Sequence, residues 1–192
     1  HLIKGRHKPG DVIPLKIVRD KKEIEVQLKL ARNNDETLLI PEDVTGQRTD
    51  YVVSGGFIVR ELTGRYLRAH GMDWQKSVDP RLTHYYAMST STPSKPGEHV
   101  VILSSVLPDI INVGYQHLRN QVVTSINGKP VKNMDDVFAV VNADGGIKAV
   151  KLLSMGVELV LDQGELPAAD VRLSKMFRIP ELKSASRNAP KK

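Results

Sequence analysis

The sequence predicts an α+β fold that is mainly β. Alternating apolar and polar runs rich in β-branched residues occur near both ends of the chain, at 13–30 and at 148–161. Helical signals are fewer. The clearest is 133–144, which has Asn133 as N-cap, acidic residues in its first turn and an apolar face at 134, 137, 138 and 141. We therefore expect a sheet-based fold that carries a small number of helices.

The first element expected is a hairpin of strands 13–18 and 23–30, joined by the polar turn Arg19-Asp20-Lys21-Lys22. Pro14 belongs at a strand start or edge because it has no backbone N–H to donate. A similar hairpin is expected at 148–154 and 157–161. The two align loosely, which is weak evidence for a repeated unit.

The middle of the chain begins with a polar linker at 32–50, followed by YVVSGGFIVREL, which predicts strand, glycine turn and strand. A short helix ended by Gly71 comes next, and then a loop-rich stretch with one helical turn around 82–88. Trp74 is expected to anchor this stretch to the core. A buried strand at 99–106, the Asn127-Gly128 turn and the 133–144 helix complete the order.

Composition excludes several classes of function. The 192 residues contain no cysteine, so disulfides, zinc–thiolate sites and thiol catalysis are excluded. Aromatic residues make up only 5 % and the charge of +6 is spread out, which argues against a nucleic-acid partner. No apolar run is long enough to span a membrane. No cofactor and no metal site are expected, because His84 has no second ligand at helical spacing.

The motif VVTSINGKPVKNMDDV, with the preceding HVVILSSVLPD, resembles a PDZ domain of the HtrA/Deg serine-protease family. The opening HLIKGRHKPGDVIPLKIVRDKKEIEVQLKL resembles the last third of another such domain, and VELVLD followed by RIPELKS resembles the plant-type Deg branch. The resemblance implies a small antiparallel β-barrel or sandwich capped by two helices. It also implies four parts: residues 1–31 from a first PDZ domain, a linker at 32–50, a second PDZ domain at 51–182 with an insertion at about 61–97, and a disordered basic tail at 183–192.

The stretch Ser54-Gly55-Gly56-Phe57 allows two interpretations. Ser-Gly-Gly occurs in the nucleophile loop of trypsin-like proteases, but catalysis also needs a general base and an orienting carboxylate, and the 53 upstream residues are too few to build that fold. We therefore expect no catalytic residue in this chain. The alternative is a PDZ-type carboxylate loop whose backbone N–H groups hold the end of a peptide. The peptide-binding candidates are Gly55, Gly56, Phe57, Ile58, Val59, Met134, Val137, Phe138 and Val141.

These features predict a non-catalytic PDZ region that binds C-terminal or unfolded polypeptide segments and regulates a protease. The chain has no initiator Met, so we expect it to be part of a longer protein, an HtrA/Deg serine endopeptidase, in the periplasm or an organelle by resemblance only. A homo-oligomer is expected. The alternative is an assembly domain whose groove is filled by its own insertion or by a neighbouring subunit. A tight glycine turn beside an ordinary core helix also remains open.

Overall fold

The computed structural model describes residues 7–8, 10–30, 38–42, 49–91, 95, 97–156 and 158–184. The chain divides into two compact units, residues 1–34 and residues 35–192. Most of the expected linker (32–37 and 43–48) and most of the expected basic tail (185–192) lie outside the described part.

The first unit is the hairpin predicted at the start of the chain. Its strands are β1 (Val12–Arg19) and β2 (Lys22–Lys29), paired antiparallel along their full length. The tight turn is formed by Asp20 and Lys21, both with positive φ. Three cross-strand pairs place apolar side chains on one face: Ile13 with Leu28, Leu15 with Val26, and Ile17 with Ile24. None of the described residues of this unit is buried, so the hairpin has an apolar face without a core.

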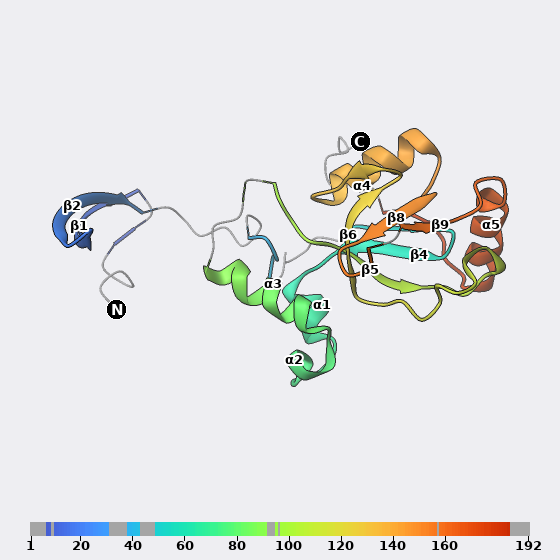
Figure 1. Cartoon of the computed structure of the whole chain (residues 1–192), viewed down its shortest axis with the longest axis horizontal. Coiled ribbons are helices and arrows are strands. Elements are labelled where there is room, and N and C mark those ends of the chain that lie inside the picture. The colour runs from blue at the N-terminus through green and yellow to red at the C-terminus, as the bar shows by residue number, and fades with distance from the viewer. Residues whose placement is uncertain are drawn as a thin grey trace. The chain divides into compact units, whose positions relative to one another are not determined.

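The second unit is built on one sheet with the strand order β3-β4-β5-β6-β8-β9, and β7 pairs with β6 at the side (Figure 1). Every pairing is antiparallel. The mainly β, α+β expectation is confirmed. The described strands do not close into a barrel, because no pairing joins β3 to β9. The strands are β3 (Tyr51–Ser54), β4 (Phe57–Glu61), β5 (Val101–Val106), β6 (Gln121–Ile126), β7 (Lys129–Pro130), β8 (Ala149–Leu152) and β9 (Glu158–Val160).

Helix α4 (Met134–Asp144) supplies one wall of the main core. Its N-cap is Asn133, whose side chain accepts from the Asp136 N–H, and it ends at Gly145 in the left-handed conformation. The N-cap matches the sequence prediction, and glycine suits the left-handed conformation at the C-terminal end. Its apolar face packs with the inner face of the sheet in one large cluster that includes Phe57, Val59, Leu103, Ile126 and Val150.

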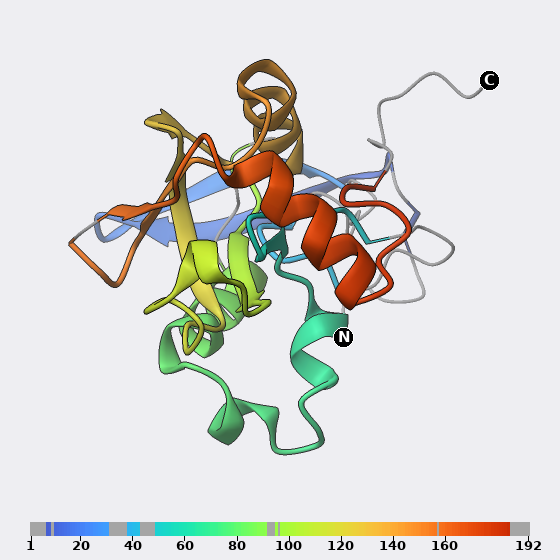
Figure 2. The ribbon, with the colours of Figure 1, turned by 90° about the vertical axis from the view of Figure 1, so that its right-hand side faces the viewer.

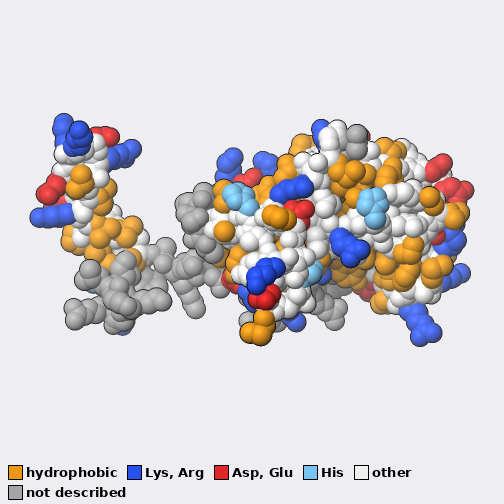
Figure 3. Space-filling view, turned by 60° about the horizontal axis from the view of Figure 1, so that its bottom comes forward, with side chains coloured by type: hydrophobic (Ala, Val, Ile, Leu, Met, Phe, Trp, Pro, Cys, Tyr) orange, Lys and Arg blue, Asp and Glu red, His pale blue; other side chains and the backbone are white. Residues whose placement is uncertain are grey.

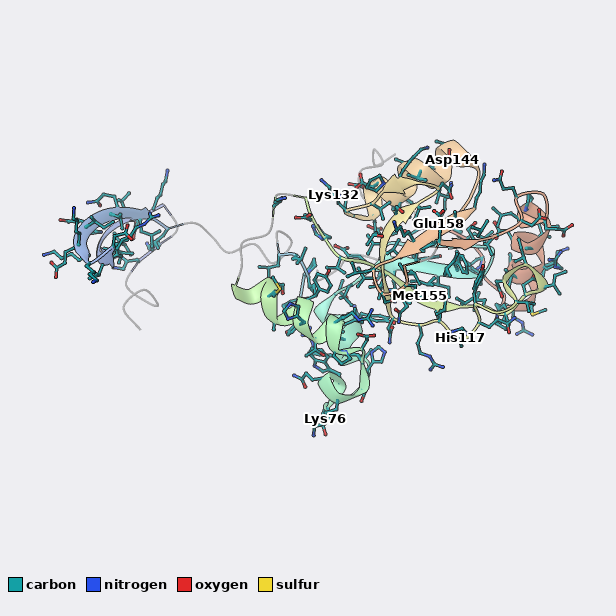
Figure 4. All side chains as sticks on the ribbon, viewed as in Figure 1. Lys76, His117, Lys132, Asp144, Met155 and Glu158 are labelled. Carbon is teal, nitrogen blue, oxygen red and sulfur yellow. The ribbon has the colours of Figure 1, made fainter. Side chains whose placement is uncertain are left out.

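The described residues of the expected insertion contain three helices, α1 (Gly64–Arg68), α2 (Trp74–Ser77) and α3 (Pro80–Ser91), which are green in Figure 1. The loop-rich expectation with one helical turn was wrong for 80–91. Pro80 preorganises the first turn of α3, and the Asp79 side chain accepts from the Arg81 N–H. These helices form a second apolar cluster against Ile102 of β5, and Trp74 is buried in it as expected. Lys76 lies at the outer end of α2 (Figure 4).

A last helix, α5 (Leu166–Met176), follows β9 and is the red helix at the front of Figure 2. It is fixed to the short 3-10 helix η2 (Ile110–Asn112) by a two-fold hydrogen-bonded ion pair, in which Arg172 donates from Nε and Nη2 to Asp109 at 3.1 and 2.7 Å. Leu166, Ala169 and Leu173 are its buried face. The helix therefore holds residues 177–184 close to the start of the sheet. None of the described helices is long and apolar enough to cross a membrane.

Candidate functional site

The edge strand β3 and the turn that follows it form the first wall of the candidate site. Gly55 and Gly56 have φ values of 55° and 87° and close a tight hairpin between β3 and β4. A Cβ on Gly56 would lie 2.3 Å from the Leu107 carbonyl oxygen and 2.3 Å from the Asn112 side-chain nitrogen. The turn therefore requires glycine both for its backbone conformation and for space.

The polar groups of this turn are paired within the chain. The Gly55 N–H donates to Asp170 Oδ1 at 2.6 Å, and the Asn112 amide donates to the carbonyls of Gly55 and Leu107, each at 2.8 Å. Ser54 is buried, and its Oγ accepts from the Ile147 N–H at 3.0 Å. The carboxylate expected at the glycine turn is thus present, but it comes from α5 of the same chain.

Burial raises the pKa of the Asp170 carboxyl above its ordinary value, while hydrogen bonds from the Gly55 N–H and the Ser54 side chain act in the opposite direction. The energetic cost of a half-buried carboxylate is offset only in part by these two donors. Asp170 therefore stabilises the glycine turn through its hydrogen bond with Gly55, and the protonation of its carboxyl is coupled to the stability of this wall.

The second wall is the C-terminal half of α4. Together with β3, α5 and the segment 180–183 it encloses a cleft of about 670 Å³. Val141 is the apolar α4 residue that lines this cleft, and the polar Asn142 and the helix-ending Gly145 line it as well. None of the described residues between 61 and 97 lines this cleft.

A short segment of the chain, residues 181–184, pairs with the outer edge of β3; we call it the strap. The Val53 N–H donates to the Leu182 carbonyl at 2.6 Å, and the Ser184 N–H donates to the Tyr51 carbonyl at 3.0 Å. Val52 and Lys183 form an antiparallel bridge between them. The strap is thus a strand added to the sheet edge.

Side chains hold the strap at both ends. The Tyr51 N–H donates to Ser184 Oγ at 3.1 Å, and the Tyr51 hydroxyl donates to the Glu181 carbonyl at 2.9 Å. On the helix side, Lys183 Nζ donates to Asn142 Oδ1 at 2.5 Å. Leu182 and Ser184 are only half-buried, and the other two residues are exposed. The strap is therefore held mainly by hydrogen bonds rather than by burial of apolar surface.

The nine predicted peptide-binding residues do not share one surface. Phe57, Val59 and the four α4 residues are all buried in the main core, whereas Ile58 is half-buried on the opposite face of the sheet. β4 pairs with β3 on one side and with β5 on the other, so both of its edges are already paired within the chain. Peptide contact by these nine residues stays a prediction.

Sequence reasoning did not find the strap or Asp170. The strap carries one apolar residue, Leu182, in a basic and polar stretch, and a four-residue strand without alternation gives no periodic signal. Asp170 lies 115 residues from Gly55 in the sequence, so only the packing of α5 brings the two together. Residues 183 and 184, expected to begin a disordered tail, lie in the strap.

Comparison with known proteins identifies the family. The family described as "PDZ domain" matches residues 40–186 of this chain. The chain belongs to the PDZ domain family. The chain is similar to two Do-like proteins of Arabidopsis thaliana: a mitochondrial Do-like 3 protein, 26 % identical over 181 residues, and the chloroplastic protease Do-like 2, 24 % identical over 176 residues. Those matches cover 94 % and 92 % of this chain but only 29 % and 28 % of the two relatives.

A mitochondrial Do-like 12 protein of the same plant is 29 % identical over 127 residues, which is 66 % of this chain and 21 % of that protein. The resemblance to the PDZ region of HtrA/Deg-type proteases is therefore confirmed. This chain spans less than a third of the length of these Do-like relatives.

Proposed function

We propose that this PDZ region is non-catalytic and binds extended polypeptide segments by adding them as a strand along the edge of β3, beside α4. The strap is the observation that carries this proposal. Its two backbone hydrogen bonds to Tyr51 and Val53 are the bonds that a bound peptide makes in β-augmentation. The same edge would accept a segment of another polypeptide once the strap leaves it.

The strap is suited to displacement because it buries little surface. Only Leu182 places an apolar side chain toward the cleft, and the cleft keeps a volume of about 670 Å³ with the strap in place. A tethered segment competes at an effective concentration of roughly millimolar, so an unfolded substrate with larger apolar side chains would replace it. In the parent protease, such exchange would report the presence of unfolded polypeptide.

The test is fluorescence anisotropy of a labelled apolar peptide with the full chain and with Ser184→Pro. This substitution removes the N–H that donates to the Tyr51 carbonyl and the oxygen that accepts from the Tyr51 N–H. We expect micromolar affinity and tighter binding by Ser184→Pro, with Ser184→Ala between the two because it keeps its N–H. Equal, weak binding by all three proteins would contradict strand addition at this edge.

A free and an amidated form of the same peptide separate strand addition from carboxylate capture. The glycine turn already holds the Asp170 carboxylate. The chain continues beyond Ser184, so the strap pairs with β3 without a free C-terminal carboxylate. Strand addition at β3 therefore predicts equal binding of both forms. Loss of binding on amidation would support the carboxylate loop formed by Gly55 and Gly56 instead.

The second candidate function is assembly of protease subunits, and the first unit favours it. The hairpin of β1 and β2 has three apolar cross-strand pairs on one face, and an isolated two-stranded hairpin is marginally stable in water. A partner surface over that face would complete its core. The mass of the chain in solution tests this candidate independently of peptide binding.

A further inference from the structure

A second cleft lies on the opposite face of the sheet from the main core. It has a volume of about 560 Å³ and is bounded by β4, β5, helix α1 and the loop at 116–120. Three of its lining residues carry basic side chains: Arg60 from β4, His70 from the end of α1 and Arg119 from the loop. Gln116, Ser105 and Asn120 add polar groups, and none of the described lining residues is acidic.

Arg60 is the unusual residue of this cleft. Its guanidinium carbon lies 4.5 Å from the centre of the Tyr66 ring, a cation–π contact that fixes the side chain. Within the described residues its Nε is buried without a hydrogen-bond partner. Burial lowers the pKa of Arg60, which reflects the cost of holding this charge away from water.

Contacts among the neighbouring side chains fix the position of Arg60. The Tyr66 hydroxyl donates to Asn120 Oδ1 at 2.5 Å, which ties α1 to the loop across the cleft. The rings of Tyr66 and His70 are edge-to-face at 5.1 Å. Glu61, the acidic neighbour of Arg60 in sequence, is buried and contacts His99. The Glu61 carboxylate favours the charged form of Arg60, but the buried Nε still lacks a hydrogen-bond partner among the described residues. Holding the guanidinium this way is costly, and a bound anion would offset the cost.

We propose that this cleft binds an oxyanion, a carboxylate or phosphate group, with Arg60 as its principal ligand. A planar guanidinium pairs with either group through two parallel hydrogen bonds, and its stacking on an aromatic ring leaves those donors available. Arg119 adds a second positive charge at the rim. The site is separate from the strap and from the proposed strand addition, since it shares no lining residue with the first cleft.

The test is the thermal stability of the full chain in inorganic phosphate, in succinate and in chloride at equal ionic strength. We expect phosphate, succinate or both to raise the melting temperature above chloride, and the comparison of the two identifies which oxyanion chemistry the cleft prefers. Isothermal titration then gives the dissociation constant. Arg60→Gln should weaken it by about tenfold or more, as expected for loss of a charge-assisted pair.

Arg65→Gln is the matched control, because it removes the same charge from α1 at a residue outside the cleft lining. We expect it to bind the anion as the parent does. Arg119→Gln, exposed at the rim, should keep the parent's stability in chloride and weaken binding in part, which provides a test even if Arg60→Gln does not fold. No stabilisation beyond chloride, or equal binding by the parent, Arg60→Gln and Arg119→Gln, would overturn the proposal.

Discussion

Gly56 offers the sharpest test of the wall between the strap and the core. Substitution by alanine places a methyl group 2.3 Å from the Leu107 carbonyl oxygen and 2.3 Å from Asn112 Nδ2, at a φ of 87°. Relief of this overlap requires movement of Asn112, which is fully buried and donates to two backbone carbonyls. The Leu107 carbonyl cannot move independently, because the Leu107 N–H donates to the Gly56 carbonyl at 2.8 Å.

The magnitude follows from these contacts. The positive φ alone costs about 1–2 kcal/mol for a residue with a Cβ. Loss of two buried hydrogen bonds adds about 1–3 kcal/mol. We therefore expect Gly56→Ala to lower the free energy of unfolding by roughly 2–5 kcal/mol in total, a large fraction of the stability of a domain of this size. The measurement is urea unfolding followed by far-UV circular dichroism and by the fluorescence of Trp74.

Gly128→Ala is the control that introduces the strain of a positive φ without the steric overlap. Gly128 has a φ of 75°, and a Cβ there would meet no atom within 4 Å. The φ strain and the effect of alanine on the unfolded chain are thus common to both variants. Gly56→Ala should be less stable than Gly128→Ala by about 1–3 kcal/mol, the hydrogen-bond part. Equal losses in the two variants would refute the argument that the turn is locked by Asn112 and Leu107.

Three further predictions concern the other parts of the chain. Because the pKa of Asp170 is raised in the fold, the parent loses stability as pH rises from the ordinary value of 3.8 through the folded pKa. The melting temperature of Asp170→Asn should therefore rise relative to that of the parent over this pH range and then stay at a constant difference. Val26→Lys should shift the weight-average mass toward the monomer in analytical ultracentrifugation, whereas Gln27→Lys, on the other face of β2, should not; an unchanged mass for both would exclude the hairpin face as a contact between copies. Deuterium exchange at the Val53 amide should rise in Ser184→Pro, because the strap that accepts its hydrogen bond is released, and an unchanged rate would show that the strap stays paired.

Local sequence signals predicted the elements that depend on neighbours in the chain. Asn133 with two acidic residues fixes the start of α4, and Asn127-Gly128 fixes the turn between β6 and β7. The hairpin of β1 and β2 follows from alternation alone. Helix α3 was missed because its serine and threonine content weakens the periodic signal, while burial of Leu82 beside Trp74 stabilises it in the fold.

The candidate site was harder to predict because its contacts are long-range. The Gly55-Gly56 turn was recognised from sequence, but its partner Asp170 comes from a helix whose position depends on the Arg172–Asp109 pair. On the face shown in Figure 3, Lys and Arg side chains are interspersed with acidic and apolar ones. The pairing of the strap with β3 and the burial of Arg60 beside Tyr66 both arise only after the chain has folded.

The two sites give different expectations for how a ligand changes the protein. A peptide on β3 must displace the strap, and the strap follows α5 directly, so binding there would free residues 181–184 and loosen the Lys183–Asn142 bond to α4. An oxyanion beside Arg60 displaces no segment and pairs with a guanidinium whose Nε has no hydrogen-bond partner among the described residues. Hydrogen exchange should therefore increase at the strap when peptide binds and decrease around α1 when the anion binds. The reverse pattern is incompatible with the geometry of either site, since neither the strap nor α5 lines the Arg60 cleft.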